Sequence, residues 1–131
     1  MEQLVFAPEE SVQSRLRLGE YNRRFFRETA DLSCCVERDG NCLGGITAWR
    51  ADELVMVDLL WVADDCRGNG LGRRLLSAVE AEGRRLGALR VELNTFGFQA
   101  PGFYEKLGYR RFAALEPAVG DWGHYFYLKE L

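Results

Sequence analysis

The residues best placed to do chemistry lie between positions 57 and 76, where three glycines stand within five residues. An apolar run leads into Arg67, the glycines follow at 68, 70 and 72, and an amphipathic run continues from them. This order points the unpaired N–H groups of a helix N-terminus at whatever lies over the turn. Glycine lets a phosphate approach the backbone closely, and Arg67 adds a fixed positive charge. The segment therefore predicts an anion site, best suited to a diphosphate.

The spacing of the glycines separates this turn from other phosphate-binding loops. The G-x-x-x-x-G-K-[ST] pattern of nucleoside triphosphatases is absent, and neither Gly68 nor Gly70 begins a G-x-G-x-x-G dinucleotide fingerprint. The pattern present is R-x-x-G-x-G, from Arg67 to Gly72. Six residues alone also fit a purely structural turn, so the rest of the chain has to decide between the two interpretations.

Composition limits the class of protein. A chain of 131 residues with 47% hydrophobic and 28% charged residues is expected to fold as one domain, residues 1–131. The net charge of −3 argues against nucleic acid and anionic membranes as partners, and no apolar run reaches the roughly 18 to 20 residues of a membrane span. Four cysteines without a C-x-x-C pair and a single histidine predict no metal site. The expected compartment is the cytoplasm.

The first half of the chain predicts helices followed by short strands. Pro8 predicts a helix start, Gly19 predicts its end, and a second helix is expected to run to about Ala30. The pattern then becomes extended, and Asp39-Gly40-Asn41 predicts a hairpin turn. Strands over residues 33–38, 42–49 and 54–62 should form an antiparallel meander.

The second half adds a strand–helix–strand unit. Apolar residues at helical spacing predict a helix that Gly87 ends, and alternation over residues 89–94 predicts a strand. A connection of this length implies a parallel crossover.

Pro101 opens a short helix that Gly108 closes, and residues 109–112 and 125–129 are expected to be strands. The loop between those strands should hold Glu116, Pro117, Gly120, Asp121 and Gly123. The fold class is therefore α/β, with a single mixed, mostly antiparallel central sheet and helices on both faces.

Two motifs together make the chain resemble the GNAT superfamily of N-acetyltransferases. The acyl-CoA motif of that family, a strand followed by R-x-x-G-x-G and a long helix, is matched by LLWVADDCRGNGLGRRLL, and its C-terminal aromatic helix is matched by FYEKLGY at residues 103–109. The resemblance covers residues 42–129, and LGEYN at residues 18–22 is similar to one small bacterial branch. It implies a GNAT-like fold as a single acetyltransferase domain, with acetyl coenzyme A as co-substrate.

The resemblance also implies which residues contact the co-substrate. Its pantetheine arm is expected to pair with the strand end at residues 60–62, where backbone N–H groups can polarise the thioester carbonyl. Many relatives carry an asparagine where this chain has Gly97, so Asn94 or Gln99 is expected to take part instead. The residues assigned to this contact are Leu60, Trp61, Val62, Arg67, Gly68, Asn69, Gly70, Leu71, Gly72, Asn94, Gln99 and Phe103.

Acetyl transfer needs an acid for the departing thiolate and a base for the amine. By resemblance Tyr104 is the general acid, and a phenol with a pKa near 10 can protonate an alkyl thiolate; the alternative is that it only packs beside Phe103. Asp58 is the first candidate base, because burial in an apolar strand would raise its pKa, but it could equally face solvent. Glu92, His124 and a water relay are the alternatives.

The early helices and the aromatic residues are expected to bind the acceptor. The candidates are Tyr21, Asn22, Trp49, Phe96 and Phe98, each of which could instead be ordinary packing. Together these features predict transfer of the acetyl group of acetyl coenzyme A to a primary amine of a small molecule by direct attack. A catalytically silent acyl-CoA sensor and a peptide N-acetyltransferase are the alternatives. A homodimer is expected by analogy with relatives.

Overall fold

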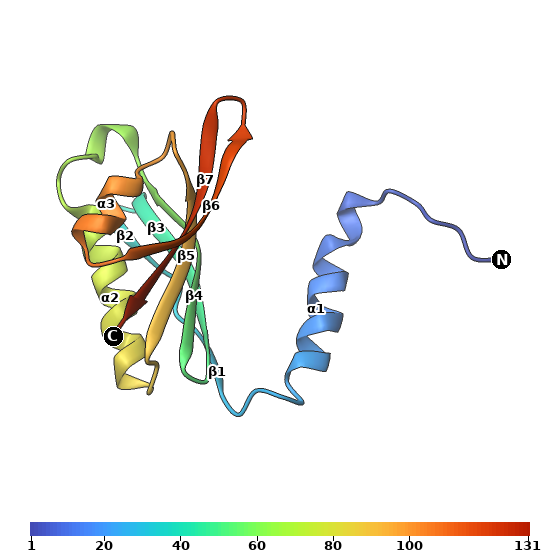
Figure 1. Cartoon of the computed structure of the whole chain (residues 1–131). Coiled ribbons are helices and arrows are strands. Elements are labelled where there is room, and N and C mark those ends of the chain that lie inside the picture. Colours follow the sequence, from blue (N-terminus) through green and yellow to red (C-terminus); the bar gives the residue numbers. More distant parts are fainter.

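One seven-stranded sheet organises the chain, and helices lie on its two sides (Figure 1). The computed structural model describes residues 1–131. Its strands are β1 (Thr29–Asp31), β2 (Cys34–Arg38), β3 (Asn41–Ala51), β4 (Leu54–Val62), β5 (Arg90–Phe96), β6 (Arg110–Val119) and β7 (Trp122–Glu130). Its helices are α1 (Ser11–Asn22), α2 (Leu71–Arg85) and α3 (Pro101–Lys106), with short 3-10 turns at Pro8–Glu10 and Asp64–Cys66. No helix has both the length and the apolar character needed to cross a bilayer.

The strand order confirms the predicted mixture of antiparallel and parallel pairing. Strands run in the order β1-β3-β4-β5-β7-β6, and β2 also pairs with β3. The β2–β3 hairpin turns at Asp39 and Gly40, both with positive φ, as the turn residues predicted. Only β4 and β5 are parallel, and α2 is the crossover between them. The predicted meander and crossover are both present.

The core lies between the sheet and α2. Leu76 and Val79 of α2 are almost fully buried, as are Val55 of β4, Val91 of β5 and Tyr127 of β7. These side chains belong to one cluster, which Tyr104 of α3 also joins. Helices α2 and α3 therefore cover the same face of the sheet, and Figure 1 shows both on that side.

Helix α1 lies on the other side of the sheet and stands away from it (Figure 1). None of its twelve residues is buried. We call the face of the sheet that α2 and α3 do not cover the open face. Within a single chain, α1 does not cover it either.

The prediction for the N-terminal helices was wrong in two places. Gly19 does not end the first helix: α1 continues to Asn22, and the Arg23 N–H donates to the Gly19 carbonyl over 3.1 Å. A glycine costs a helix only about 1 kcal/mol, which the hydrogen bonds of the following turn can offset. The expected second helix is absent, because Thr29–Asp31 pairs with β3 as the short strand β1. Pairing with a distant strand therefore makes this segment extended, although its local sequence pattern predicts a helix.

The last hairpin is longer than predicted. Strand β6 extends to Val119, so Glu116 and Pro117 lie within it, and only Gly120 and Asp121 remain between the strands. The pairing of β6 with β7 is irregular between Leu115 and Val119. Since β6 is at the edge of the sheet, a proline in this irregular stretch interrupts no ladder on its outer side.

Candidate functional site

A gap opens between the two parallel strands at the centre of the sheet. Strands β4 and β5 pair only from Leu54 with Arg90 to Met56 with Glu92. Beyond this point β4 continues to Val62 and β5 continues to Phe96, without pairing to each other. On the side toward β5, the backbone N–H and C=O groups of β4 after Met56 therefore have no hydrogen-bonding partner in a neighbouring strand. Such an edge can accept an extended, amide-bearing ligand as an added strand.

A bulge in β4 sits where the gap begins. Ala48 pairs with Val57, but Thr47 pairs with Leu59, so Asp58 is an extra residue in β4. The bulge reverses the alternation of the strand. Leu60 then packs against the core, as Val57 does, whereas Trp61, 48% exposed, lies on the open face beside Gly45. The predicted carrier-contact residues 60–62 thus line one side of the gap.

The glycine turn ends at an uncapped helix N-terminus. Gly68 and Gly70 have φ values of +83° and +79°, which glycine adopts readily. Gly70 precedes α2 and no side chain caps the helix, whose first backbone bond runs from the Arg74 N–H to the Gly70 carbonyl. The N–H groups before Arg74 are therefore available to an anion, with Asn69 and Leu71 beside them.

Gly72 has a different role from the other two glycines. A β-carbon there would lie 3.3 Å from the Phe103 ring and 3.7 Å from the Val62 side chain. The absent side chain therefore lets the first turn of α2 approach α3 and the end of β4. This contact brings the gap, the glycine turn and the aromatic helix to one place.

Three arginines surround the turn. The Arg67 guanidinium donates to the Val62 carbonyl over 3.3 Å and pairs with Asp64 at 3.2 Å, so its charge is held beside the end of β4. Arg73 and Arg74 lie exposed in the first turn of α2. Neither arginine belongs to the R-x-x-G-x-G pattern. Their position in the first turn of α2 is the signal that places them near a bound anion.

Tyr104 is a buried ring with a free hydroxyl. The side chain is 9% exposed, and its ring packs against Phe103, Tyr109 and Tyr127 at centroid distances of 5.1, 6.0 and 6.2 Å. Burial raises the pKa of Tyr104 above its ordinary value. Its hydroxyl makes no hydrogen bond within the chain, and no buried polar side-chain atom is left without a partner. The hydroxyl therefore retains access to solvent and to a ligand.

On the open face, several predicted residues come together around His124. Its Nε2 lies 3.1 Å from Oδ1 of Asn94, and its ring stacks on Phe96 at 4.4 Å. Phe98 stacks on Phe96 at 5.4 Å. Gln99 has another role: its Oε1 accepts from the Phe96 N–H over 2.6 Å, which holds the turn after β5.

The remaining predicted residues are dispersed. Asp58 is exposed at the bulge, which corresponds to the solvent-facing alternative and not to the buried carboxylate. Trp49 lies on the open face and contacts the ring of Phe26 at 6.1 Å. Tyr21 and Asn22 lie on α1, which a single chain does not bring to the sheet (Figure 1).

This geometry agrees with the family match. The family model for the acetyltransferase (GNAT) family matches residues 2–109. The chain belongs to the GNAT family of acetyltransferases. The mixed α/β sheet described above is therefore the sheet of a GNAT-family protein.

Named relatives and solved structures show the same relationship. The chain is 43% identical over 82 residues to blasticidin-S acetyltransferase of Streptomyces morookaense; the match covers 62% of this chain and 60% of that protein. A crystal structure of an acetyltransferase from Bacillus cereus is 26% identical, with a TM-score of 0.82, covering all of this chain and 98% of the other. A candidate streptothricin acetyltransferase from Bacillus anthracis, solved with acetyl coenzyme A, shares the fold at 14% identity and a TM-score of 0.68, over 83% and 67% of the two chains.

Proposed function

We propose that this member of the GNAT family transfers the acetyl group of acetyl coenzyme A to a primary amine of a small molecule by direct attack. One observation carries the proposal. The unpaired edge of β4, the uncapped start of α2 and the helix that holds Tyr104 meet at the contact of Gly72 with Phe103 and Val62.

The residues present fit an acyl carrier of this kind. The free N–H groups at the start of α2, with Arg67, Arg73 and Arg74 around them, suit a diphosphate. The backbone of β4 from Leu59 to Val62 suits the amides of a pantetheine arm. Acetyl coenzyme A would supply an activated thioester in the gap. A β4 backbone N–H would polarise its carbonyl without any special side chain.

Acetyl transfer moves two protons, one to the departing sulfur and one from the amine, and the groups that exchange them would lie on different sides of the gap. Tyr104 would donate its proton to the sulfur as the carbon–sulfur bond breaks, and its raised pKa keeps the phenol protonated near neutral pH. The proton lost by the amine would pass to His124 or Asp58, directly or through water. His124 is oriented by Asn94 and Phe96, and its Nδ1 makes no hydrogen bond within the chain.

The nature of the acceptor is inferred from the open face and from the relatives. The rings of Phe96, Phe98 and His124 offer apolar surface beside a polar group, which suits an amine that itself carries apolar surface. The relative named for blasticidin-S acts on a small molecule, as its name states. The aromatic rings of the open face and this relative together support a small-molecule amine as the acceptor.

The test is release of free thiol from acetyl coenzyme A in the presence of a panel of amines, with calorimetry for carrier binding. Tyr104→Phe should lower kcat by about 100-fold or more while the affinity for coenzyme A stays within twofold. Tyr109→Phe is the matched control: this buried tyrosine in the same cluster bonds to Glu80, so kcat should change little.

Three outcomes contradict the proposal. Carrier binding without turnover on any amine would indicate a sensor. Turnover on peptides alone would indicate a peptide N-acetyltransferase. Equal rates for Tyr104→Phe and wild type would remove Tyr104 from the mechanism.

A further inference from the structure

The N-terminal arm, residues 1–26, exposes far more apolar surface than a stable segment should. Five of its side chains, Phe6, Val12, Leu16, Leu18 and Phe25, are 94%, 64%, 56%, 59% and 68% exposed. Apolar side chains clustered on one exposed segment mark an interaction site. The arm therefore needs a partner surface.

The length of α1 leads to the same conclusion. A helix of twelve residues is marginal in water without tertiary packing, and α1 has no buried residue. At 100° per residue, Val12 and Leu16 lie on one side of α1, whereas Leu18 and Tyr21 lie on nearly the opposite side. The ring of Phe25, just after the helix, packs against Tyr21 at 5.3 Å. A helix that is apolar on two sides fits a position between two bodies better than a position on one surface.

The direction in which α1 leaves the sheet is fixed by hydrogen bonds. From α1 onward the backbone N–H groups of Arg23, Arg24, Phe25 and Phe26 each donate to a carbonyl three or four residues earlier. The connection to the sheet is thus a hydrogen-bonded turn and not a loose linker.

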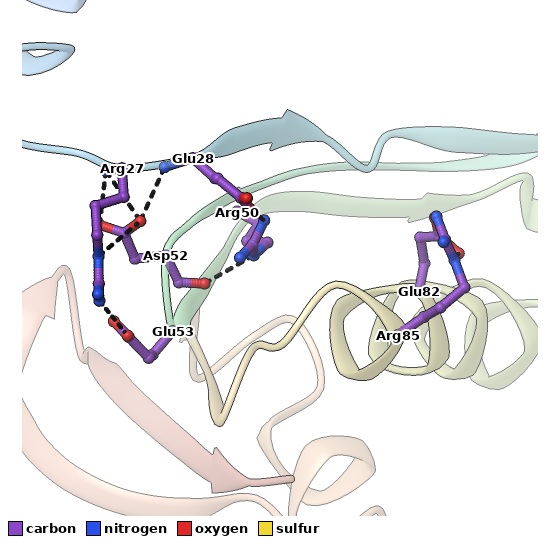
Figure 2. A network of polar contacts seen from close by, with 7 residues as sticks. All are labelled: Arg27, Glu28, Arg50, Asp52, Glu53, Glu82 and Arg85. Atoms are coloured by element: carbon purple, nitrogen blue, oxygen red, sulfur yellow. Dashed lines mark hydrogen bonds and ion pairs between the residues drawn. The ribbon is translucent and has the colours of Figure 1, made fainter.

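A cluster that we call the Asp52 clamp then holds the chain to the sheet (Figure 2). The Asp52 carboxylate accepts the backbone N–H groups of Arg27 and Glu28 at 2.9 to 3.2 Å. Arg27 pairs with Glu53 at 2.7 Å, and Arg50 pairs with Glu28 at 3.0 Å. The connection is thus held at α1 by the hydrogen-bonded turn and at the sheet by the Asp52 clamp. In this arrangement α1 projects away from its own sheet (Figure 1).

The open face of the sheet offers the complementary surface. Its apolar residues are uncovered or half-covered: Leu59 and Trp61 are 53% and 48% exposed, and the strand register places Trp49, Met56 and Phe96 on the same face. The register also places charges of both signs at this face, with Arg90 and Arg110 on the same side as Glu92. The match between the arm and the open face is therefore one of apolar surface.

We propose that two copies of this chain exchange their N-terminal arms, so that α1 of each copy covers the open face of the other and brings Tyr21 and Asn22 to the acceptor side of the other copy's gap. The acceptor part of this inference rests on the proposed function. The exchange itself rests only on the arm, the Asp52 clamp and the open face. Each site is then incomplete without the second copy.

The first test measures assembly and needs no activity. Light scattering coupled to gel filtration, over a dilution series, should find a dimer for the wild type. Leu16→Asp should shift it to monomer at micromolar concentration, whereas Gln13→Asp, the same charge at an exposed polar position of α1, should leave the dimer intact. A monomeric wild type, or a Leu16→Asp dimer as stable as the wild type, would overturn the exchange.

The second test asks whether the arm completes the site of the other copy. Tyr104→Phe chains have an intact arm and a disabled site, and Tyr21→Ala chains have the reverse. Co-expressed at equal levels, they should regain about a quarter of wild-type activity, because half of the dimers then contain one complete site. Activity no higher than the mean of the two single variants would place the arm on its own chain. If the wild type dimerises through α1 but turns over no amine, the proposed function fails and the exchange stands.

Discussion

At the scale of single residues, Gly70 is the position at which ligand binding to the free N-terminus of α2 can be tested separately from packing. Its φ is +79°, and a β-carbon there would find no heavy atom within 4 Å. Packing within the chain therefore does not require a glycine at this position. A glycine is required by the left-handed backbone conformation and by a ligand that approaches the N–H groups of α2.

Gly70→Ala should weaken coenzyme A binding by about tenfold or more, equivalent to about 1.4 kcal/mol, because the new methyl group stands where the diphosphate would approach. Gly40→Ala is a matched control, since Gly40 has a φ of +80°, equally open surroundings and a place in the β2–β3 turn. Both variants bear the same backbone strain of about 1–2 kcal/mol, so thermal melts should agree. Calorimetry with coenzyme A checks the difference. Equal affinities for the two variants would show that the turn binds no diphosphate.

The residue-scale predictions were best where local geometry sets the outcome. The turn at Gly68 and Gly70 precedes a helix in the structure as predicted, since positive φ and a following amphipathic run are local properties. The role of Gly72 could not be read locally, because it depends on the Phe103 ring from a distant helix. The family match confirms the predicted acetyltransferase class. The catalytic and binding roles of individual residues remain predictions.

At the scale of elements, a buried polar group joins α2 to the last part of the sheet. Glu80 of α2 accepts from the Tyr109 hydroxyl over 2.7 Å and pairs with Lys129 of β7 at 3.0 Å. Glu80 is 6% exposed, so these two partners take the place of water around its side chain. This group fixes α2 relative to β7 and so supports the helix whose start forms the glycine turn.

Glu80→Ala should lower the free energy of unfolding by about 3 kcal/mol, because it leaves the Lys129 charge and the Tyr109 hydroxyl without their partner. Glu82→Ala, two residues along the same helix, is the control. The Glu82–Arg85 pair is exposed to solvent, which screens it, so its loss should lower the stability much less than Glu80→Ala does. Urea unfolding followed by circular dichroism measures both. Similar midpoints for the two variants would show that the Glu80 group contributes no more than a surface pair.

Element predictions succeeded where the pattern was strongly periodic and failed where distant pairing decided. Helix α2 and the β2–β3 hairpin were predicted because their apolar spacing and turn residues are local. Strand β1 was mistaken for helix because only its pairing with β3 makes Thr29–Asp31 extended. The bulge at Asp58 had no sequence signal, since it appears only in the register of β4 against β3.

At the scale of the whole molecule, the chain has one complete face and one incomplete face. Helices α2 and α3 cover the side of the sheet from which Tyr104 and the glycine turn reach the gap. The open face, with His124 and Phe96, is left without its cover because the Asp52 clamp directs α1 away. The sequence alone could place Tyr21 and Asn22 in an early helix. It could not predict whether that helix packs on the sheet of its own chain or on that of a second copy.

The Asp52 clamp gives a test of this arrangement at a distance from both α1 and the open face. Asp52 has a φ of +49°, which glycine and asparagine both tolerate, so the substitutions Asp52→Gly and Asp52→Asn differ mainly in the acceptor oxygen for the Arg27 and Glu28 N–H groups. Asp52→Gly should release the direction of the arm and move dimer dissociation to higher protein concentration. Asp52→Asn should retain most of the wild-type affinity. Sedimentation equilibrium measures both.

Acid provides an independent check on the same group. The N–H groups of Glu28 and Arg27 hold the pKa of Asp52 below its ordinary value, so the stabilisation is present above about pH 4 and is lost as the pH falls through the lowered pKa. The advantage of the wild-type dimer over Asp52→Gly should therefore shrink in that acid range. The Asp52→Asn dimer has no such titration and should keep its advantage over Asp52→Gly there. A gap between wild type and Asp52→Gly that stays constant with pH, or equal dissociation of all three proteins at neutral pH, would mean that the clamp does not set the path of the arm.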